Sequence, residues 1–287
     1  MLNKYKIIFI LIIGSVIFFS FFKSFKDYLV LKNYYSKSIY VYNFTDNKVE
    51  IGLNESKRLP LASLTKIVTV MVSLENINDL SEIAPVDSDS YLEMVNKNSS
   101  MAGFRGNEQT TYRDLLYGAI LSSGGEAADS LAINISGSID DFVFLMNKFK
   151  DNLKLKNTNF KNAEGMDDEN HFSSAEDIAK ILKYSLNDGD FRAIFTKKEF
   201  LSTQTLDHPQ GLLITSTVFN KLKDYSRTGF EIEGGKSGTT FNAGHCLATL
   251  CKKNEKEYIV VVMGSPIGDD FSGDGEILDT IKIMSEI

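Results

Sequence analysis

The chain has 287 residues, of which 43% are apolar, and its 31 Lys plus Arg against 38 Asp plus Glu give a formal net charge of -7. This length and apolar content suffice for a sizeable core in one large domain or two closely packed subdomains, and they argue against disorder. No basic stripe follows the first thirty or so residues, so the composition argues against a nucleic-acid partner.

An apolar segment near the N-terminus carries a membrane signal. Residues 7–22, IIFILIIGSVIFFSFF, contain no charge and have lysines on both sides, which leaves the orientation open. A bilayer span needs about 20 residues, so the segment 7–22 is marginal in length. No small-residue cleavage site follows it, which argues against a removed signal peptide. The pattern favours an uncleaved, single-pass transmembrane anchor and stalk over residues 1–30, followed by a globular domain over residues 31–287.

Strand patterns occur near both ends of the globular region. SIYVYNF (38–44) and VEIGL (49–53) flank the polar turn TDNK and predict a β-hairpin. GHCLATLC (244–251) and EYIVVVMG (257–264) flank KKNEK and predict a second one. The two cysteines of the second hairpin are expected as core residues or as neighbours across the hairpin; they are Cys246 and Cys251.

Helical periodicity dominates between the hairpins, and an all-helical subdomain is expected over about residues 85–215. One helix starts near Ser63, because Pro60 precedes it, and another follows the capping box that runs from Ser173 to Glu176. An antiparallel sheet closed by distant segments and flanked by helices is an α+β fold. The expected helices are 64–74, 112–121, 127–135, 139–153, 175–186 and one from residue 275.

Two common kinds of hydrolytic site are not supported. The three histidines have no metal-ligand spacing, so no metal is expected, and no G-x-S-x-G elbow accompanies them. No other cofactor is expected either. A serine can instead be activated by a lysine.

The stretch Ser63-Leu64-Thr65-Lys66 places a hydroxyl and an amine three residues apart on one helix face. Lys66 can accept the Ser63 proton only if burial lowers its pKa from about 10.4, and a shift of roughly three units corresponds to about 4 kcal/mol. A helix N-terminus adds partial positive charge and free N–H groups. The pattern alone is weak evidence, because residues 20–23 match it too.

Two further motifs follow in order. AILSSGGEAADSLA (119–132) contains Ser123, and EGGKSGTT (233–240) contains Lys236 in front of a strand-like segment. S-x-x-K, S-D-N and K-T-G in this order are the set of penicillin-binding proteins and class A β-lactamases. Three matching parts in order are much less expected by chance than one.

Over residues 38–287 the chain resembles the serine D-alanyl-D-alanine carboxypeptidases, the low-molecular-weight penicillin-binding proteins. The resemblance implies a β-lactamase/penicillin-binding-protein-like fold and removal of the terminal D-alanine from peptidoglycan stem peptides. It also implies covalent inhibition by β-lactam antibiotics and an extracellular catalytic domain at the cell membrane. The segments that carry it are LPLASLTKIVTVMVSLE, DLLYGAILSSGGEAADSLA, FKNAEGMDDENHFSSAEDIAKI and GGKSGTTFNAGHCLAT.

The resemblance also assigns the catalytic roles. Ser63 attacks the carbonyl between the two D-alanines while Lys66 accepts its proton, and an acyl-enzyme forms. Ser123 relays a proton to the departing D-alanine, supported by Lys236.

The expected substrate-binding residues surround the third motif. The hydroxyls of Ser237 and Thr239 hold the substrate carboxylate beside Gly238, and the N–H groups of Ser63 and Thr239 form the oxyanion hole. The second motif adds Gly125, which occupies the place where the family usually has Asn and supplies no side-chain amide.

Two alternatives remain open. A class A-like β-lactamase needs a deacylation base between the second and third motifs, where Glu164 lies, although NAEGMDD follows the N-x-x-G pattern of the carboxypeptidases. A catalytically weak penicillin-sensing or wall-binding domain is suggested by Gly125. Relatives often also use an Arg after the third motif for the carboxylate, but none follows Arg227, so that role is left to Ser237, Thr239 and Lys236. The sequence does not separate carboxypeptidase from endopeptidase or transpeptidase activity.

Overall fold

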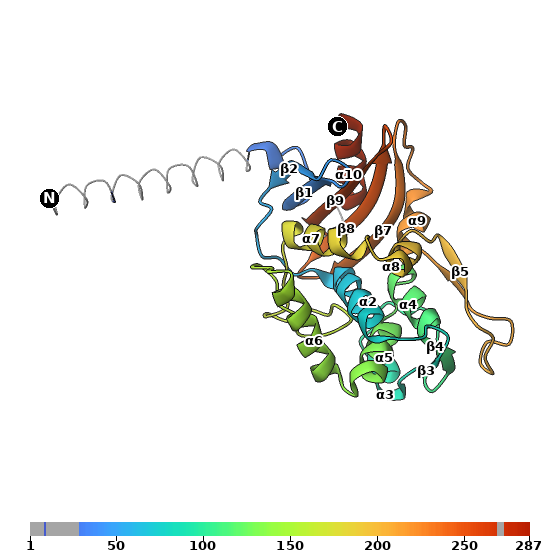
Figure 1. Ribbon diagram of the computed structural model, residues 1–287. Coiled ribbons are helices and arrows are strands. Elements are labelled where there is room, and N and C mark those ends of the chain that lie inside the picture. Colours follow the sequence, from blue (N-terminus) through green and yellow to red (C-terminus); the bar gives the residue numbers. More distant parts are fainter. Residues whose placement is uncertain (1–8, 10–28, 269–272) are drawn as a thin grey trace.

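The computed structural model describes residue 9, residues 29–268 and residues 273–287 (Figure 1). All but one residue of the expected anchor segment 7–22 therefore lies outside the described part of the chain. Among the described helices, none has the length and apolar character of a membrane span.

A five-stranded sheet forms one layer of the molecule (Figure 1). Both expected hairpins are confirmed, and they join edge to edge because β1 pairs antiparallel with β9. Segments from the two ends of the globular region thus complete one sheet, as the α+β prediction required. In spatial order the strands are β2 (Lys48–Leu53), β1 (Ser38–Asn43), β9 (Lys256–Ser265), β8 (Gly244–Lys253) and β7 (Glu231–Thr240).

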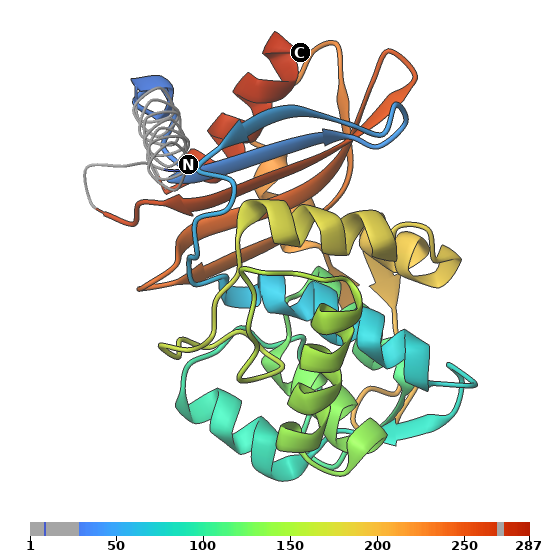
Figure 2. The same ribbon diagram turned by 60° about the vertical axis from the view of Figure 1, so that its left-hand side comes forward.

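The sheet separates two hydrophobic cores. Side chains of a strand alternate between faces, so Ile39 and Val41 of β1 enter one core while Tyr40 and Tyr42 enter the other. Figure 2 shows the sheet as a layer between α10 (Gly275–Glu286) and the helical region. The smaller core lies under α10 and α9 (Thr217–Leu222).

The two cysteines both lie on β8, buried and unpaired. Cys246 belongs to the larger core and Cys251 to the smaller one, so they lie on opposite faces of the sheet. The expectation of core residues is confirmed, whereas the alternative of neighbours across a hairpin is wrong.

The larger core is organised around α2 (Thr65–Asn76), which is buried continuously from Thr65 to Ser73. A helix that is buried on all sides must be surrounded by other elements. Helices from later parts of the chain pack around it: α4 (Tyr112–Leu121), α5 (Gly125–Ser136), α6 (Ile139–Asn152), α7 (Ala175–Ser185) and α8 (Gly189–Phe195).

The helical subdomain departs from its predicted form in two ways. It is not all-helical, because it carries two short antiparallel pairs, and α5 begins two residues before the expected start, so the break after α4 is shorter. The remaining elements are α3 (Ser88–Asn96), β3 (Ile83–Pro85), β4 (Gln109–Thr111), β5 (Glu199–Leu201) and β6 (Leu213–Thr215).

The start of α7 corrects the expected capping box by one residue. Ser174 is the N-cap, and its hydroxyl accepts a hydrogen bond from the backbone N–H of Asp177. Ser173 lies just outside the helix, where its backbone bridges to Leu59. From the sequence alone, either of the two adjacent serines could cap the helix. Because the backbone of Ser173 pairs with Leu59, Ser174 is the residue left to cap it.

A buried carboxylate of α10 is among the groups that hold the segment before β1. Asp279 of α10 is 1% exposed and accepts hydrogen bonds from the backbone N–H groups of Tyr35, at 3.1 Å, and Ser36, at 2.7 Å. The chain is therefore fixed to α10 directly before it enters the sheet.

Because β1 joins the two hairpins, its apolar face should be critical for stability. We expect Ile39→Ala to lower the free energy of unfolding by about 2–5 kcal/mol, since the Ile39 side chain is fully buried. Urea unfolding of the full chain in mild detergent measures the change. Val49→Ala on β2 is the control, because Val49 is 53% exposed; equal effects of the two substitutions would contradict the assignment.

Candidate active site

Ser63 lies in the middle of a 3₁₀ turn, Ala62–Leu64, here called the nucleophile turn, that leads directly into α2. Ala62 has a φ of 48°, in the left-handed region that residues with a side chain rarely adopt. The Thr65 hydroxyl donates to the Ala62 carbonyl at 2.7 Å and holds this turn. Ser63 is half-buried and accessible from solvent, as a nucleophile must be.

Lys66 lies one turn further along and is 1% exposed. Its Nζ donates to Ser63 Oγ at 3.2 Å and to the Glu164 carbonyl at 2.5 Å. Burial lowers the pKa of Lys66 to about 8, although the charges of Glu164, Asp129 and Glu126 act to raise it. A neutral amine beside the Ser63 hydroxyl is therefore accessible near neutral pH.

A second serine and lysine pair faces this one. Ser123 lies in the break between α4 and α5 with a φ of 60°. Lys236 of β7 is fully buried, and its Nζ donates to Ser123 Oγ at 2.8 Å and to the Ser237 carbonyl at 2.6 Å. Burial first, and then the Lys66 cation, hold the pKa of Lys236 well below its usual value. The three motifs thus meet in space.

Strand β7 contacts the nucleophile turn through Gly238. A Cβ at this position would lie 2.7 Å from the Ser63 nitrogen and 3.1 Å from the Leu64 nitrogen, so only glycine permits the approach. Because β7 is an edge strand of the sheet, the N–H groups on its outer side are not used by β8.

A cavity of about 480 Å³ opens in front of Ser63. Its walls are residues 97–100, residues 164–167 and residues 239–241, so it includes Thr239 of the third motif. Phe241 stands at its edge and is 93% exposed. The nucleophile is therefore reached through a groove between the helical region and the end of β7.

The N-x-x-G turn positions the carbonyl that Lys66 uses. Asn162 Oδ1 accepts a hydrogen bond from the Gly165 N–H at 2.8 Å, which closes the turn. Gly165 has a φ of 93°, and a Cβ there would lie 2.1 Å from the Ala62 carbonyl oxygen. This turn fits against the nucleophile turn only with glycine, and it presents the Glu164 carbonyl to the Lys66 amine.

Gly125 is the first residue of α5 and is buried. Its N–H donates to the Ser100 carbonyl at 2.8 Å. A Cβ at this position would lie 2.6 Å from Met94 Sδ and 2.9 Å from Ser99 Oγ. The ends of these two side chains thus lie where a Cβ would point, and the role of Gly125 in substrate binding stays a prediction.

Two contacts near the third motif were not anticipated from the sequence. Thr217 Oγ1 lies 3.2 Å from Ser237 Oγ, and His245 Nδ1 lies 2.9 Å from Thr239 Oγ1. The second could have been found from hairpin register, because Thr239 and His245 are directly opposite on β7 and β8. Both hydroxyls expected to hold the substrate carboxylate therefore have a polar partner behind them.

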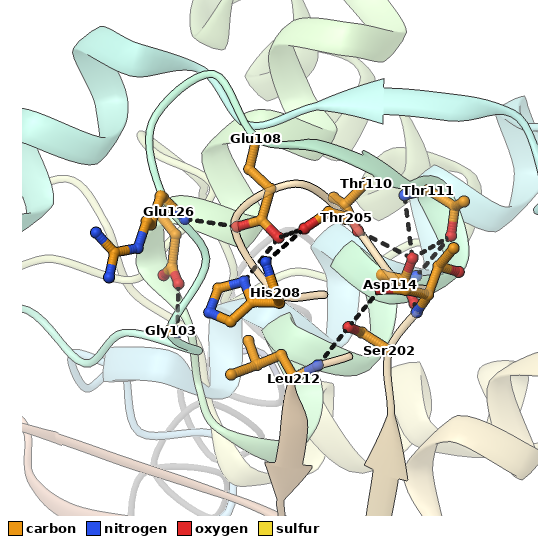
Figure 3. A network of polar contacts seen from close by, with 12 residues as sticks. Gly103, Glu108, Thr110, Thr111, Asp114, Glu126, Ser202, Thr205, His208 and Leu212 are labelled. Carbon is orange, nitrogen blue, oxygen red and sulfur yellow. Dashed lines mark hydrogen bonds and ion pairs between the residues drawn. The ribbon is translucent and has the colours of Figure 1, made fainter. Parts of the chain in front are cut away.

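A separate polar network supports the region before the second motif (Figure 3). Buried Glu108 accepts a hydrogen bond from the Thr205 hydroxyl at 2.7 Å and contacts His208 Nδ1 at 2.8 Å. Asp114 at the start of α4 accepts from the Thr203 N–H at 3.0 Å. These contacts fix the long β5–β6 loop against α4, the helix that ends at the second motif.

His171 supports the nucleophile turn from behind and is 2% exposed. Its Nδ1 accepts a hydrogen bond from the Lys161 N–H at 2.9 Å, so Nε2 carries the proton and donates to Thr65 Oγ1 at 2.7 Å. Thr65 in turn donates to Ala62. A neutral imidazole thus completes a chain of hydrogen bonds that ends at the strained residue before Ser63.

Burial lowers the pKa of His171 from 6.5 to about 4, despite Asp168 and Asp167, which act to raise it. Between these two pH values the unfolded chain binds more protons than the native one, so stability falls as pH decreases. We expect this group to lower the free energy of unfolding by up to about 3 kcal/mol over that window. Urea unfolding of the wild type and His171→Asn from pH 7 to pH 4 measures it, and equal pH dependence of the two proteins would disprove it.

Comparison with known proteins agrees with the family resemblance found in the sequence. A family model described as D-alanyl-D-alanine carboxypeptidase, Peptidase S11, matches residues 30–266. The D-alanyl-D-alanine carboxypeptidase DacF of Bacillus subtilis is 33% identical over 238 residues, which are 80% of this chain and 57% of DacF. A D-alanyl-D-alanine endopeptidase of Pseudomonas aeruginosa is 31% identical over 231 residues, 79% of this chain and 71% of that protein.

Solved structures agree with these matches. The Streptomyces K15 DD-transpeptidase superposes with a TM-score of 0.77 at 25% identity, covering 88% of this chain and 96% of its own. This similarity confirms the expected penicillin-binding-protein-like fold. The chain spans little more than half the length of DacF. The family model nevertheless covers most of the chain, and the chain therefore belongs to the D-alanyl-D-alanine carboxypeptidase family, Peptidase S11.

Proposed function

We propose that this protein is a serine DD-peptidase that removes the terminal D-alanine from peptidoglycan stem peptides. The observation that carries the proposal is the meeting of two serine–lysine pairs with buried amines, Ser63 with Lys66 and Ser123 with Lys236, beside the edge strand β7. A peptide that binds in the groove in front of Ser63 can lie along the edge strand β7, with its C-terminal end near the Ser63 hydroxyl.

Acylation uses the first pair. Neutral Lys66 accepts the Ser63 proton as Oγ attacks the carbonyl between the two D-alanines. The oxyanion that forms is held by the N–H groups of Ser63 and Thr239, and each such donor is typically worth about 3–4 kcal/mol. The C–N bond then breaks, and the proton taken by Lys66 passes through the Ser123 hydroxyl to the departing nitrogen. Water later hydrolyses the ester and releases the shortened peptide.

Recognition of the terminal carboxylate uses the third motif. Ser237 and Thr239 offer hydroxyls at the end of β7, and Lys236 contributes to the field there. His245 orients the Thr239 hydroxyl from β8. No arginine follows Arg227 in the sequence, so this set carries the recognition in the proposal.

The cellular setting is part of the same proposal. An N-terminal anchor over residues 7–22 would hold the catalytic domain at the outer face of the cell membrane, where the peptidoglycan substrate lies. β-Lactam antibiotics would acylate Ser63 as covalent inhibitors, because they present a reactive carbonyl to the same nucleophile.

The nucleophile is tested with labelled penicillin and with a peptide that ends in D-Ala-D-Ala. We expect the wild type to take up label and release D-alanine, and Ser63→Ala to lose both by at least about a thousandfold. Ser123→Ala should also lose D-alanine release, whereas Ser122→Ala is its matched control, because the Ser122 hydroxyl donates to the Thr215 carbonyl at 3.3 Å, away from the lysine amines. Equal labelling of the wild type and Ser63→Ala would overturn the assignment.

The same assays separate the alternatives. Labelling without D-alanine release would favour a penicillin-sensing domain, and rapid turnover of penicillin would favour a β-lactamase. Cleavage of cross-linked stem peptides in place of linear ones would assign the protein as an endopeptidase.

Gly238 provides a second test. Gly238→Ala places a methyl group against the backbone of the nucleophile turn and displaces β7, so we expect penicillin acylation to slow by about a hundredfold. The control is Gly189→Ala, since a Cβ at Gly189 meets nothing within 4 Å. Unchanged acylation of Gly238→Ala would show that the contact between β7 and Ser63 does not position the reacting groups.

A further inference from the structure

Helix α5 places a carboxylate one turn beyond Gly125. Asp129 is four residues after Gly125, so both lie on the same face of the helix. Gly125 supplies no side chain, and Met94 and Ser99 occupy the space above it. One polar group that α5 offers near the site is the Asp129 carboxyl, whose charge state bears on Lys66.

The Asp129 carboxyl meets the side chain of Glu164 from the N-x-x-G turn. The two side chains are hydrogen-bonded, Asp129 is 4% exposed and Glu164 is 6% exposed. Within the described residues the other Asp129 oxygen, Oδ1, has no hydrogen-bond partner. Two carboxyl groups can be hydrogen-bonded only if one of them holds a proton. Burial, and then the charge of Glu164, raise the pKa of Asp129 well above its usual value, so Asp129 is the protonated member.

The same turn contacts the catalytic amine. The backbone carbonyl of Glu164 accepts from Lys66 Nζ, while the Glu164 residue also lines the cavity in front of Ser63. A hydrogen bond that holds the Glu164 side chain on α5 therefore also fixes the carbonyl that orients Lys66.

We propose that Asp129 and Glu164 share one proton and act as a positioning pair for Lys66, which takes over the support that an amide in the second motif would give. Asp129 fixes the N-x-x-G turn through its hydrogen bond. Glu164 places one negative charge near the Lys66 amine. Gly125 is then tolerated because the polar support comes from the next turn of the same helix.

The charge on the pair opposes the effect of burial on Lys66. Burial favours the neutral amine, and a nearby negative charge favours the ammonium form. Removing the charge should let Lys66 stay neutral to lower pH. The charged groups that act on Lys66 or on the pair come from α5, the 162–165 turn, β7 and α3, and they are Glu126, Asp129, Glu164, Lys236, Glu93 and Lys97.

Two isosteric variants separate charge from hydrogen bonding. Glu164→Gln removes the charge and keeps the shape and the backbone carbonyl, whereas Asp129→Asn keeps the charge on Glu164 and replaces the shared proton by an amide N–H. We expect the Lys66 titration midpoint to fall by about one pH unit in Glu164→Gln and to stay within about 0.3 unit in Asp129→Asn. Glu169→Gln is the matched control, because Glu169 is an exposed residue of the same loop.

The midpoint is measured by NMR on full chain labelled with isotopic lysine, with the Lys66 signal assigned by its loss in Lys66→Arg. Urea unfolding of each variant verifies folding. The proposal is overturned if Glu164→Gln leaves the midpoint unchanged, or if Asp129→Asn shifts it as Glu164→Gln does. It is also overturned if Asp129→Ala, which cannot donate a hydrogen bond, retains the wild-type midpoint and penicillin acylation rate.

The kinetic readout rests on the proposed function, and the NMR readout does not. If Ser63 acylates, the acid limb of the penicillin acylation rate should move with the Lys66 midpoint, about one unit lower in Glu164→Gln. Expected NMR shifts without any acylation of the wild type would refute the proposed function and support the positioning pair. Acylation of the wild type without the expected NMR shifts would support the proposed function and refute the positioning pair.

Discussion

The burial of two lysine amines beside two serine hydroxyls is the constraint on which the rest of the structure depends. An amine that has lost its hydration favours the neutral form, and this requires that the surrounding elements close on it from every side. Helix α2, strand β7 and the 162–165 turn provide this closure around Lys66 and Lys236. The left-handed backbone at Ala62 and Ser123 is the local cost of bringing these segments together, whereas Gly165 adopts a positive φ without strain.

No single helix or strand carries the whole site, because its residues come from both the helical region and the sheet. The helical region supplies both serines, and the sheet supplies Lys236. At the site, the two regions meet where Gly238 approaches the backbone of Ser63. Buried Glu126, which accepts from the N–H groups of Ala102 and Gly103, and the loop network in Figure 3 keep the second motif rigid from the far side.

Much of the fold could be predicted because the hairpins and helices α4, α6, α7 and α10 have strong apolar periodicity. Helix α3 could not, since it is short and buries only Ser90 and Met94. The three-residue strands that make the subdomain less than all-helical are too short to show a period. At the site, motif order predicted the two serines and the two lysines. The Asp129–Glu164 contact could not be predicted, because it depends on how a turn docks on a distant helix.

The hydrogen bonds that Asp279 accepts from the segment before β1 have a mechanical consequence. With the chain tethered through residues 7–22, as proposed, tension would first reach the contacts between residues 33–36 and α10, which include Lys282 with the Asn33 carbonyl and Asp279 with the N–H groups of residues 35 and 36. Any remaining load would act in shear along β1, which is hydrogen-bonded to β2 and β9 on its two sides. Ser63 lies beyond this load path, near the opposite edge strand, so pulling on the tether would leave the nucleophile turn undistorted.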